Sequence, residues 1–434
     1  MNLGHWVSRR HQGARAAAEP FAIDAQVGGY HLLEPLGAGG MAEVWKAKSF
    51  GPGGFERQVV IKKIHTANAS DPEFRGLFVD EARISGLLHH PNVVEVHRFD
   101  EQAGVPYLVM EYVDGPSVAR VLRGLRSSGR RMPWAIAAYI AREVCRALAY
   151  VHDLTDEIGH PLGIVHRDVT PSNVLLTRGG GVKLLDFGVA KFRQSESMTR
   201  AGMVRGKPAY LAPEQIEEKP IDRRVDLFSL GIVLHEMLSL EHLFASDSDL
   251  ITVRKVMEME IPRPSLRCAD ARGALDTIVM KALERNRDRR YQTAAEMARD
   301  LDEIVVASGL RVDEIVDFIA SVEEDMREAQ SRAVTILRSE VAAARARAGA
   351  RAPGGADRSP PPHVAAHRRR AEREMRGPRA RYDRRSTAAA VAGVALVATA
   401  LAAAFGLHVN ITTHNAARAA APGAIAACAD RRRD

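Results

Sequence analysis

The chain has 434 residues, of which 46% are hydrophobic and 26% charged, with a net charge of +7. This length can hold more than one domain, and this composition indicates a globular core and excludes a fibrous or wholly disordered chain. The three cysteines (Cys145, Cys268 and Cys428) have neither paired nor metal-ligand spacing, which argues against a disulfide scaffold and a zinc site. The excess positive charge lies in 364–385, and because no aromatic-rich or groove-reading motif accompanies it, we expect no nucleic-acid partner.

The N-terminal part of the chain reads as a flexible polar leader followed by strands. Residues 1–29 contain no apolar core long enough for a secretory signal. From 30 to 63 the pattern is strand-like, with a glycine-rich turn in the middle. An amphipathic helix is expected over 71–90, with Asp71 as its N-cap, and "PYLVMEYV" (106–113) reads as a short buried strand.

Helical patterns dominate the chain after this strand. Apolar residues keep three-and-four spacing in 133–153, short strands are expected within 163–192, and helical patterns resume from 225 to 306. The sequence therefore predicts a small strand-rich lobe with one main helix, followed by a larger helical lobe, and the two lobes together occupy 30–306.

The C-terminal part is predicted to end in a membrane span. Residues 307–347 are helix-permissive and would form a juxtamembrane extension, and 348–387 read as a disordered Arg/Pro-rich linker. The segment 388–407 carries no charge and as a helix is long enough for a hydrocarbon core of about 30 Å. Arginines on its N-terminal side predict a single-pass transmembrane helix in the inner membrane, with a cytoplasmic domain and a short extracytoplasmic tail (408–434).

The membrane interpretation of 388–407 has one alternative, and the segment also carries a weak dimerisation signal. Alanine is only weakly lipophilic, so 388–407 could instead be an alanine-rich soluble helix. The neighbouring arginines favour the membrane, because such clusters contact anionic lipid. Ala389 and Gly393 form a small-xxx-small pair, a weak signal for a homodimer.

Three features of the first lobe suit phosphate binding. The hairpin "LGAGGMAEV" (36–44) lets backbone N–H groups approach phosphate oxygens, although such a turn alone is more often structural. Strand alternation in "VVIKKI" (59–64) points Lys62 inward, where its ammonium can pair with phosphate. Glu81, on the following helix, offers a carboxylate that would hold this lysine. Taken alone, Lys62 or Glu81 would be interpreted as an ordinary surface residue, so the prediction depends on the ordered set.

A second set of motifs follows in the helical lobe. In "GIVHRDVTPSNVLL" (163–176), Asp168 can accept a proton from an attacking hydroxyl. Asn173 and Asp186 offer oxygen ligands to magnesium. Three more motifs come next in order: "YLAPE" (210–214), "RVDLFSLG" (224–231) and "RNRDRRYQTA" (285–294). In this order and at these intervals, the motifs from 30 to 306 resemble those of bacterial eukaryotic-like (Hanks-type) serine/threonine protein kinases.

The resemblance implies a bilobal α+β protein-kinase fold, serine/threonine kinase activity in signalling, and two cofactors, ATP and Mg²⁺. It implies that Asp168 is the base and that Asn173 and Asp186 are the magnesium ligands. Met110 resembles the gatekeeper at the back of the adenine pocket. The resemblance assigns ATP binding to a larger set: Gly37, Ala38, Gly39, Gly40, Val44, Lys62, Glu81, Met110, Glu111 and Val113.

Two positions depart from the family pattern. Where the family has a lysine two residues after the catalytic aspartate, this chain has Thr170, and where the family has a threonine before "YLAPE", it has Lys207. The exchange predicts a compensated catalytic site, in which Lys207 neutralises the γ-phosphate and the Thr170 hydroxyl supplies the bridging hydrogen bond. The alternative is a pseudokinase, a nucleotide-binding scaffold with weak or no catalysis.

The remaining expectations concern regulation and partners. The resemblance implies that Glu214 pairs with Arg290 to anchor the activation segment, and that Asp226 supports the catalytic loop. Ser195, Ser197 and Thr199, in the part of the activation segment at 193–206, are candidate phosphosites, with Thr199 favoured, and a phosphate there could pair with Arg167 and order this segment. The expected partners are ATP, protein substrates with serine or threonine hydroxyls, and a membrane. A small-molecule phosphotransferase is disfavoured, because the Glu214–Arg290 pair shapes a peptide-docking segment.

Overall fold

The computed structural model describes residues 25–39, 41–186, 208–268 and 273–350. The chain divides into two compact units, one ending at Asp325 and the other beginning at Met326. All the described motifs lie in the first unit. This unit continues past 306, the residue at which sequence patterns place the end of the domain.

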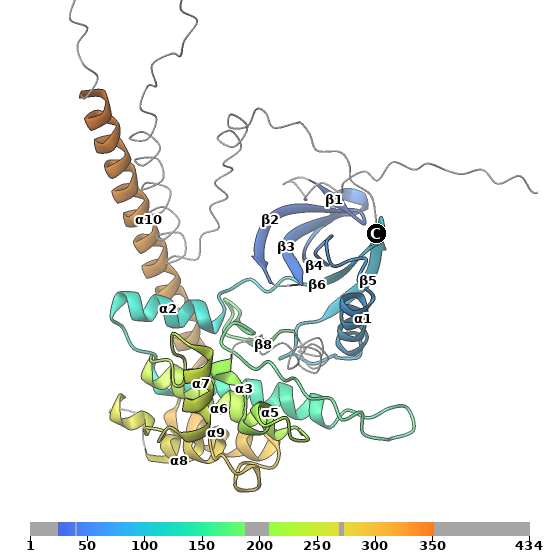
Figure 1. Ribbon diagram of the computed structural model, residues 1–434, viewed down its shortest axis with the longest axis vertical. Coiled ribbons are helices and arrows are strands. Elements are labelled where there is room, and N and C mark those ends of the chain that lie inside the picture. Colours follow the sequence, from blue (N-terminus) through green and yellow to red (C-terminus); the bar gives the residue numbers. More distant parts are fainter. Residues whose placement is uncertain (1–24, 40, 187–207, 269–272, 351–434) are drawn as a thin grey trace, which may run out of the picture. The chain divides into compact units, whose positions relative to one another are not determined.

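The first lobe is built on a six-stranded antiparallel sheet in the order β1-β2-β3-β4-β6-β5 (Figure 1). Its strands are β1 (Gln26–Val27), β2 (Tyr30–Ala38), β3 (Ala42–Phe50), β4 (Glu56–Ile64), β5 (Val96–Gln102) and β6 (Val105–Glu111). Alternate side chains of β4 enter two apolar clusters: Val59 and Ile61 join one, and Val60 and Ile64 the other. The sheet is therefore buried on both faces at its centre, which is where Lys62 lies.

The helix α1 (Pro72–Gly86) packs on this sheet. Asp71 caps its N-terminus by accepting a hydrogen bond from the backbone N–H of Glu73, and a proline occupies the first turn, where no intrahelical donor is lost. Phe78 and Ala82 join the apolar cluster on one face of the sheet, and Leu77 is also buried. The predicted cap is confirmed, whereas the helix ends four residues earlier than the predicted 71–90.

The second lobe is helical. Its helices are α2 (Val118–Ser128), α3 (Trp134–His152), α5 (Pro213–Ile216), α6 (Arg224–Ser239), α7 (Asp249–Glu258), α8 (Gly273–Ala282), α9 (Ala294–Ser308) and the first turns of α10 (Val312–Ala350), whose remainder from Met326 belongs to the second unit. A two-stranded ladder, β7 (Val174–Leu176) with β8 (Val182–Leu184), lies beside them. Every residue of α6 from Val225 to Ser239 is buried, so this helix forms the centre of the lobe, and α3 packs against both α6 and α9.

The bilobal architecture predicted from sequence is confirmed. Beyond it, the expected helical extension was 307–347, whereas in the structure α9 continues to Ser308 and α10 runs over Val312–Ala350. Within the described ranges, no helix is both long and apolar enough to cross a bilayer. The predicted transmembrane helix (388–407), the tail after it and the linker from 351 onward lie outside the described residues, whereas 348–350, expected to begin that linker, belong to α10.

Candidate active site

The site is centred on Lys62, which the middle of β4 places between the two lobes. Its Nζ lies 2.5 Å from Oε1 of Glu81 on α1 and 2.9 Å from Oδ1 of Asp186. Lys62 is 8% exposed and Glu81 5% exposed. Strand alternation thus turns the lysine inward as predicted, and the predicted Lys62–Glu81 pair is present.

The charge of Lys62 is maintained despite its burial. Desolvation lowers the pKa of this ammonium, but the carboxylates of Asp186 and Glu81 outweigh desolvation and raise the pKa above its ordinary value. Lys62 is therefore a permanent buried cation, shared by two carboxylates and able to bind phosphate oxygens.

Asp226, a fully buried residue of α6, positions the catalytic loop, which is the segment 163–176 that carries Asp168. The carboxylate of Asp226 accepts hydrogen bonds from the backbone N–H of His166 (2.8 Å) and of Arg167 (2.7 Å). It also accepts one from Nε2 of His152, at 2.8 Å. Arg167 has a left-handed backbone with φ of 65°, a strained conformation that these bonds stabilise. The role expected for Asp226 is thus seen directly in the geometry.

His166 connects the catalytic loop to the segment that carries Asp186. Its Nδ1 accepts a hydrogen bond from the backbone N–H of Asp168 (3.2 Å), and its Nε2 donates to the carbonyl of Leu185 (2.8 Å). Burial lowers the pKa of this imidazole, which favours the neutral ring that can accept at one nitrogen and donate at the other. Asp186 follows at once, also with a positive φ of 50°.

Asp168 and Asn173 lie side by side. The side-chain amide of Asn173 donates to the backbone carbonyl of Asp168 at 2.9 Å and to its Oδ2 at 2.8 Å. The amide nitrogen is thereby engaged, which leaves the Asn173 oxygen as the atom for a cation. Among the described residues, no group of three or more His, Cys, Asp or Glu side chains could hold a metal alone. Asn173 and Asp186 would hold Mg²⁺ together with phosphate oxygens, as this ion prefers.

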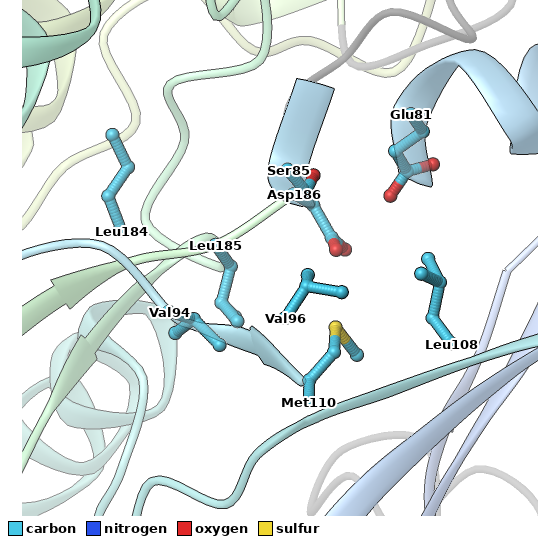
Figure 2. Close-up of a pocket in the computed structure, with 9 residues that line it drawn as sticks. All are labelled: Glu81, Ser85, Val94, Val96, Leu108, Met110, Leu184, Leu185 and Asp186. Carbon is cyan, nitrogen blue, oxygen red and sulfur yellow. The ribbon is translucent and has the colours of Figure 1, made fainter. Parts of the chain in front are cut away.

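The apolar residues expected to contact adenine lie in a cluster to which both lobes contribute. Met110 and Val113 lie in one apolar cluster, against which Val44 and Leu175 pack. Behind Met110 is a cavity of about 10 Å³, about one water in size. It is lined by Glu81, Ser85, Val94, Val96, Leu108, Met110, Leu184, Leu185 and Asp186 (Figure 2). Glu111 follows Met110 at the end of β6, and its carboxylate pairs with Lys183 at 2.7 Å.

The glycine-rich hairpin leaves room for a ligand. Gly37, Ala38 and Gly39 are exposed, and Gly40 lies outside the described residues. A Cβ added to Gly37 would meet nothing within 4 Å, so the protein itself does not require glycine there. The free space above this backbone and the buried cation of Lys62 fit a bound nucleotide triphosphate.

Thr170 is buried at 1% exposure, and its hydroxyl has no hydrogen-bond partner among the described residues. A buried hydroxyl without a partner is costly, which agrees with a partner contributed by another segment. Lys207, the partner predicted from sequence, lies outside the described residues, as does Thr199. The exchange of Thr170 and Lys207 therefore stays a prediction.

The predicted pair of Glu214 and Arg290 is present and buried. Nη1 and Nη2 of Arg290 donate to the two carboxylate oxygens of Glu214 at 2.6 Å and 2.7 Å. The guanidinium also donates to the backbone carbonyls of Glu284 (2.5 Å) and Arg285 (2.9 Å). This bidentate geometry anchors the described end of the activation segment to the helical lobe.

Several contributors to the site were not predicted from sequence. Leu175, on β7, packs against the apolar cluster that contains Met110. Its position two residues after Asn173 was the sequence signal that could have indicated this role. His65 donates from Nε2 to the carbonyl of Gly39 at 2.8 Å, while its backbone N–H donates to the carbonyl of Met41 at 2.9 Å. His65 thus fastens the glycine-rich hairpin, and nothing in the local sequence around it indicates this contact.

The two-lobed fold and its site together define a protein kinase catalytic domain. The site has a buried lysine–glutamate pair between a strand and a helix, a base bonded to an asparagine, and a bidentate Glu214–Arg290 anchor. The sequence profile of the protein kinase domain family matches residues 30–300, and the chain belongs to this family. The members of this family use ATP and Mg²⁺.

Individual relatives agree with this assignment. The chain is 38% identical over 275 residues to the tyrosine-protein kinase MasK of Myxococcus xanthus. The match covers 63% of this chain and 43% of MasK. The chain is 38% identical over 279 residues to the serine/threonine-protein kinase PknB of Mycobacterium tuberculosis, covering 63% and 42% of the two chains. The crystal structure of the Mycobacterium tuberculosis PknI kinase domain has a TM-score of 0.50 at 27% identity, covering 65% of this chain and 99% of that one. The chain thus spans about two fifths of the length of the curated relatives it matches.

Proposed function

We propose that this chain is an ATP- and Mg²⁺-dependent protein kinase that phosphorylates serine or threonine hydroxyls of proteins. One observation carries the proposal: Lys62 contacts both Glu81 and Asp186, so the residues that would bind phosphate and magnesium are already assembled across the two lobes. The Asp168–Asn173 contact adds a positioned base for the acceptor hydroxyl, which a nucleotide-binding scaffold without catalysis would not need.

Each group has a role that follows from its position. ATP and Mg²⁺ supply the phosphoryl group and neutralise its charge. Lys62 binds phosphate oxygens and is held by Glu81. Asn173 and Asp186 hold the metal, and Asp168 orients the acceptor hydroxyl and takes its proton.

The test is transfer of labelled phosphate from ATP to a general protein substrate by the full chain. Asp168→Asn is the inactive comparison, because an amide cannot accept the proton while its size is kept. Glu258→Gln on α7 is the matched control, since it neutralises an exposed carboxylate that pairs with the exposed Arg254, away from the site. Activity in the wild type and control, with loss in Asp168→Asn, supports the proposal. ATP binding without transfer in the wild type would make the chain a pseudokinase.

The compensated pair is the second part of the proposal. Lys207 supplies the positive charge that the family places at 170, and the buried hydroxyl of Thr170, unpaired among the described residues, supports a partner from that segment. Removal of one such transition-state donor costs about 100- to 1000-fold in kcat. Lys207→Ala should show this loss, and the double exchange Thr170→Lys with Lys207→Thr should restore activity. Unchanged turnover in Lys207→Ala would refute the pairing.

Acceptor type is a further part of the proposal. PknB is called a serine/threonine kinase, and MasK a tyrosine kinase, at equal identity to this chain. Tyrosine is therefore the second candidate acceptor. Phosphoamino-acid analysis of a phosphorylated protein mixture distinguishes the two, and phosphotyrosine alone would overturn the serine/threonine assignment.

Membrane attachment is proposed from sequence alone. The uncharged segment 388–407 and the arginines before it support an inner-membrane tether with a cytoplasmic kinase domain, and Ala389 with Gly393 supports dimer formation through the same helix. Membrane fractionation of the full chain, before and after a Leu396→Arg and Leu401→Arg double substitution, tests the tether. If the wild type and the double variant are equally soluble, the proposed membrane tether is refuted.

A further inference from the structure

The helix α10 begins beyond residue 300, where the match to the kinase family ends. Its first turns, Val312–Asp325, belong to the same compact unit as the catalytic site. Along these turns, one stripe of apolar residues with three-and-four spacing is buried to 7% exposure or less: Ile315, Phe318, Ile319 and Val322. A stripe of this kind is the docking face of a helix, so this part of α10 is packed against the kinase lobe.

The packing partner of this stripe is the turn between β7 and β8. A Cβ on Gly180 would lie 3.4 Å from Cγ1 of Val312 and 3.6 Å from Cγ2 of Ile315, so side chains of α10 lie close to the backbone of this turn. On its other side, the carbonyl of Gly180 accepts a hydrogen bond of 2.9 Å from the hydroxyl of Tyr139 on α3. The β7–β8 turn is thus held between α3 and α10.

A second contact ties α10 to the segment after α2. Arg130 donates to the hydroxyl of Ser321 at 2.9 Å and forms an ion pair with Asp325 at 2.5 Å. The first turns of α10 therefore have polar as well as apolar contacts with the helical lobe.

Arg178, in the same β7–β8 turn, connects α10 to the hinge, the segment 111–113 that is expected to bind adenine. Its Nε lies 3.3 Å from Oε2 of Glu323 on α10, and its Nη1 lies 3.6 Å from Oδ2 of Asp114. Its backbone N–H donates to the carbonyl of Asp114 at 3.0 Å. Asp114 directly follows Val113, the last residue assigned to adenine binding.

The segment after the hinge cannot move independently of β7. A Cβ on Gly115 would lie 1.8 Å from the carbonyl oxygen of Leu176, so the two backbones are in direct contact. The backbone N–H of Leu176 also donates to the carbonyl of Pro116 at 2.9 Å. The neighbouring Leu175 belongs to the apolar surface of the adenine pocket. A shift of the β7–β8 turn therefore moves both the hinge side and the floor of this pocket.

We propose that the start of α10, Val312–Asp325, is a positioning element for the nucleotide pocket, and that Arg178 transmits its position to the hinge. The inference rests on the proposed function, since it concerns how tightly the kinase binds ATP. Displacement of these turns would therefore lower ATP affinity without touching the catalytic residues.

The test is the affinity of the full chain for Mg-ATP, measured by calorimetry, together with KM for ATP and kcat. Arg178→Gln should raise Kd and KM for ATP about two- to fivefold with kcat retained, because a half-exposed ion pair contributes modestly. Arg178→Lys, which keeps the charge, should recover most of the affinity. Glu328→Gln is the matched control, since it removes an exposed pair with Arg332 further along the same helix.

A stronger perturbation is Ile319→Asn, which places a polar group in the buried stripe. It should raise Kd for Mg-ATP about tenfold or more, and if this variant does not fold, the result with Arg178→Gln decides. Wild-type Kd in Arg178→Gln, or a loss equal to that of Glu328→Gln, would overturn the inference while leaving the proposed function intact. Failure of the wild type to bind Mg-ATP would overturn the proposed function itself.

Discussion

Removal of Arg290 should destabilise the kinase domain far more than removal of any surface arginine. Arg290 is 2% exposed and Glu214 5% exposed, so the substitution Arg290→Met leaves a buried carboxylate without its cation. Breaking a buried pair in this way costs about 3–5 kcal/mol. The carbonyls of Glu284 and Arg285 also lose their donor, which places the expected value at the upper end.

Urea denaturation followed by circular dichroism measures this loss as a lower midpoint with an unchanged slope. The double substitution Arg290→Met with Glu214→Leu should recover a large part of the stability, because it removes both charges together. Arg254→Met is the control, since its pair with Glu258 lies on the surface of α7 and its loss should leave the midpoint unchanged. A loss of unfolding free energy below about 1 kcal/mol in Arg290→Met would refute the reasoning, because a buried carboxylate without its cation destabilises the fold by more than that.

Three further outcomes are expected. Lys62→Met should lower kcat/KM about 100- to 1000-fold in a phosphate-transfer assay, because it removes the buried cation, and full activity would contradict its role. His65→Ala should raise KM for ATP with kcat less affected, and His65→Gln, which keeps a donor for the Gly39 carbonyl, should restore KM; equal values in the two variants would exclude the clamp. Burial lowers the pKa of His235 below 6.5, so its contribution to stability is present above that pH and is lost as the pH falls through the lowered pKa. His235→Gln keeps a donor for the Pro262 carbonyl and should reduce the loss of unfolding free energy between about pH 8 and pH 5; an unchanged pH dependence would rule this histidine out.

The histidine prediction depends on the sign of the shift and on its surroundings. His235 lies on α6 at 2% exposure, and its ring contacts the carbonyl of Pro262 and the hydroxyl of Ser239. Glu236, Glu241 and Asp276 raise its pKa, but burial outweighs them. The folded protein therefore binds fewer protons here than the unfolded chain, and acid favours unfolding.

The sequence by itself determined the order of the lobes and the identity of the central residues. Two-residue alternation in 59–64 was enough to turn Lys62 inward, and an aspartate before a proline was enough to start α1. Such signals are local, because a strand or helix period and an N-cap depend on neighbours within a few positions. The motif order then supplied the family resemblance and, with it, Asp168, Asn173 and Asp186.

Only the tertiary structure decided which distant residues meet. Lys62 and Asp186 are 124 positions apart, and their 2.9 Å contact depends on how the two lobes close. His65 on Gly39, and Arg178 between Asp114 and Glu323, have no periodic signature, because each is a single contact made by chain segments that packing brings together. The burial of the first turns of α10 is of the same kind. A helical stripe shows that a face will be covered, but the element that covers it is selected by the shape and charge of the folded domain.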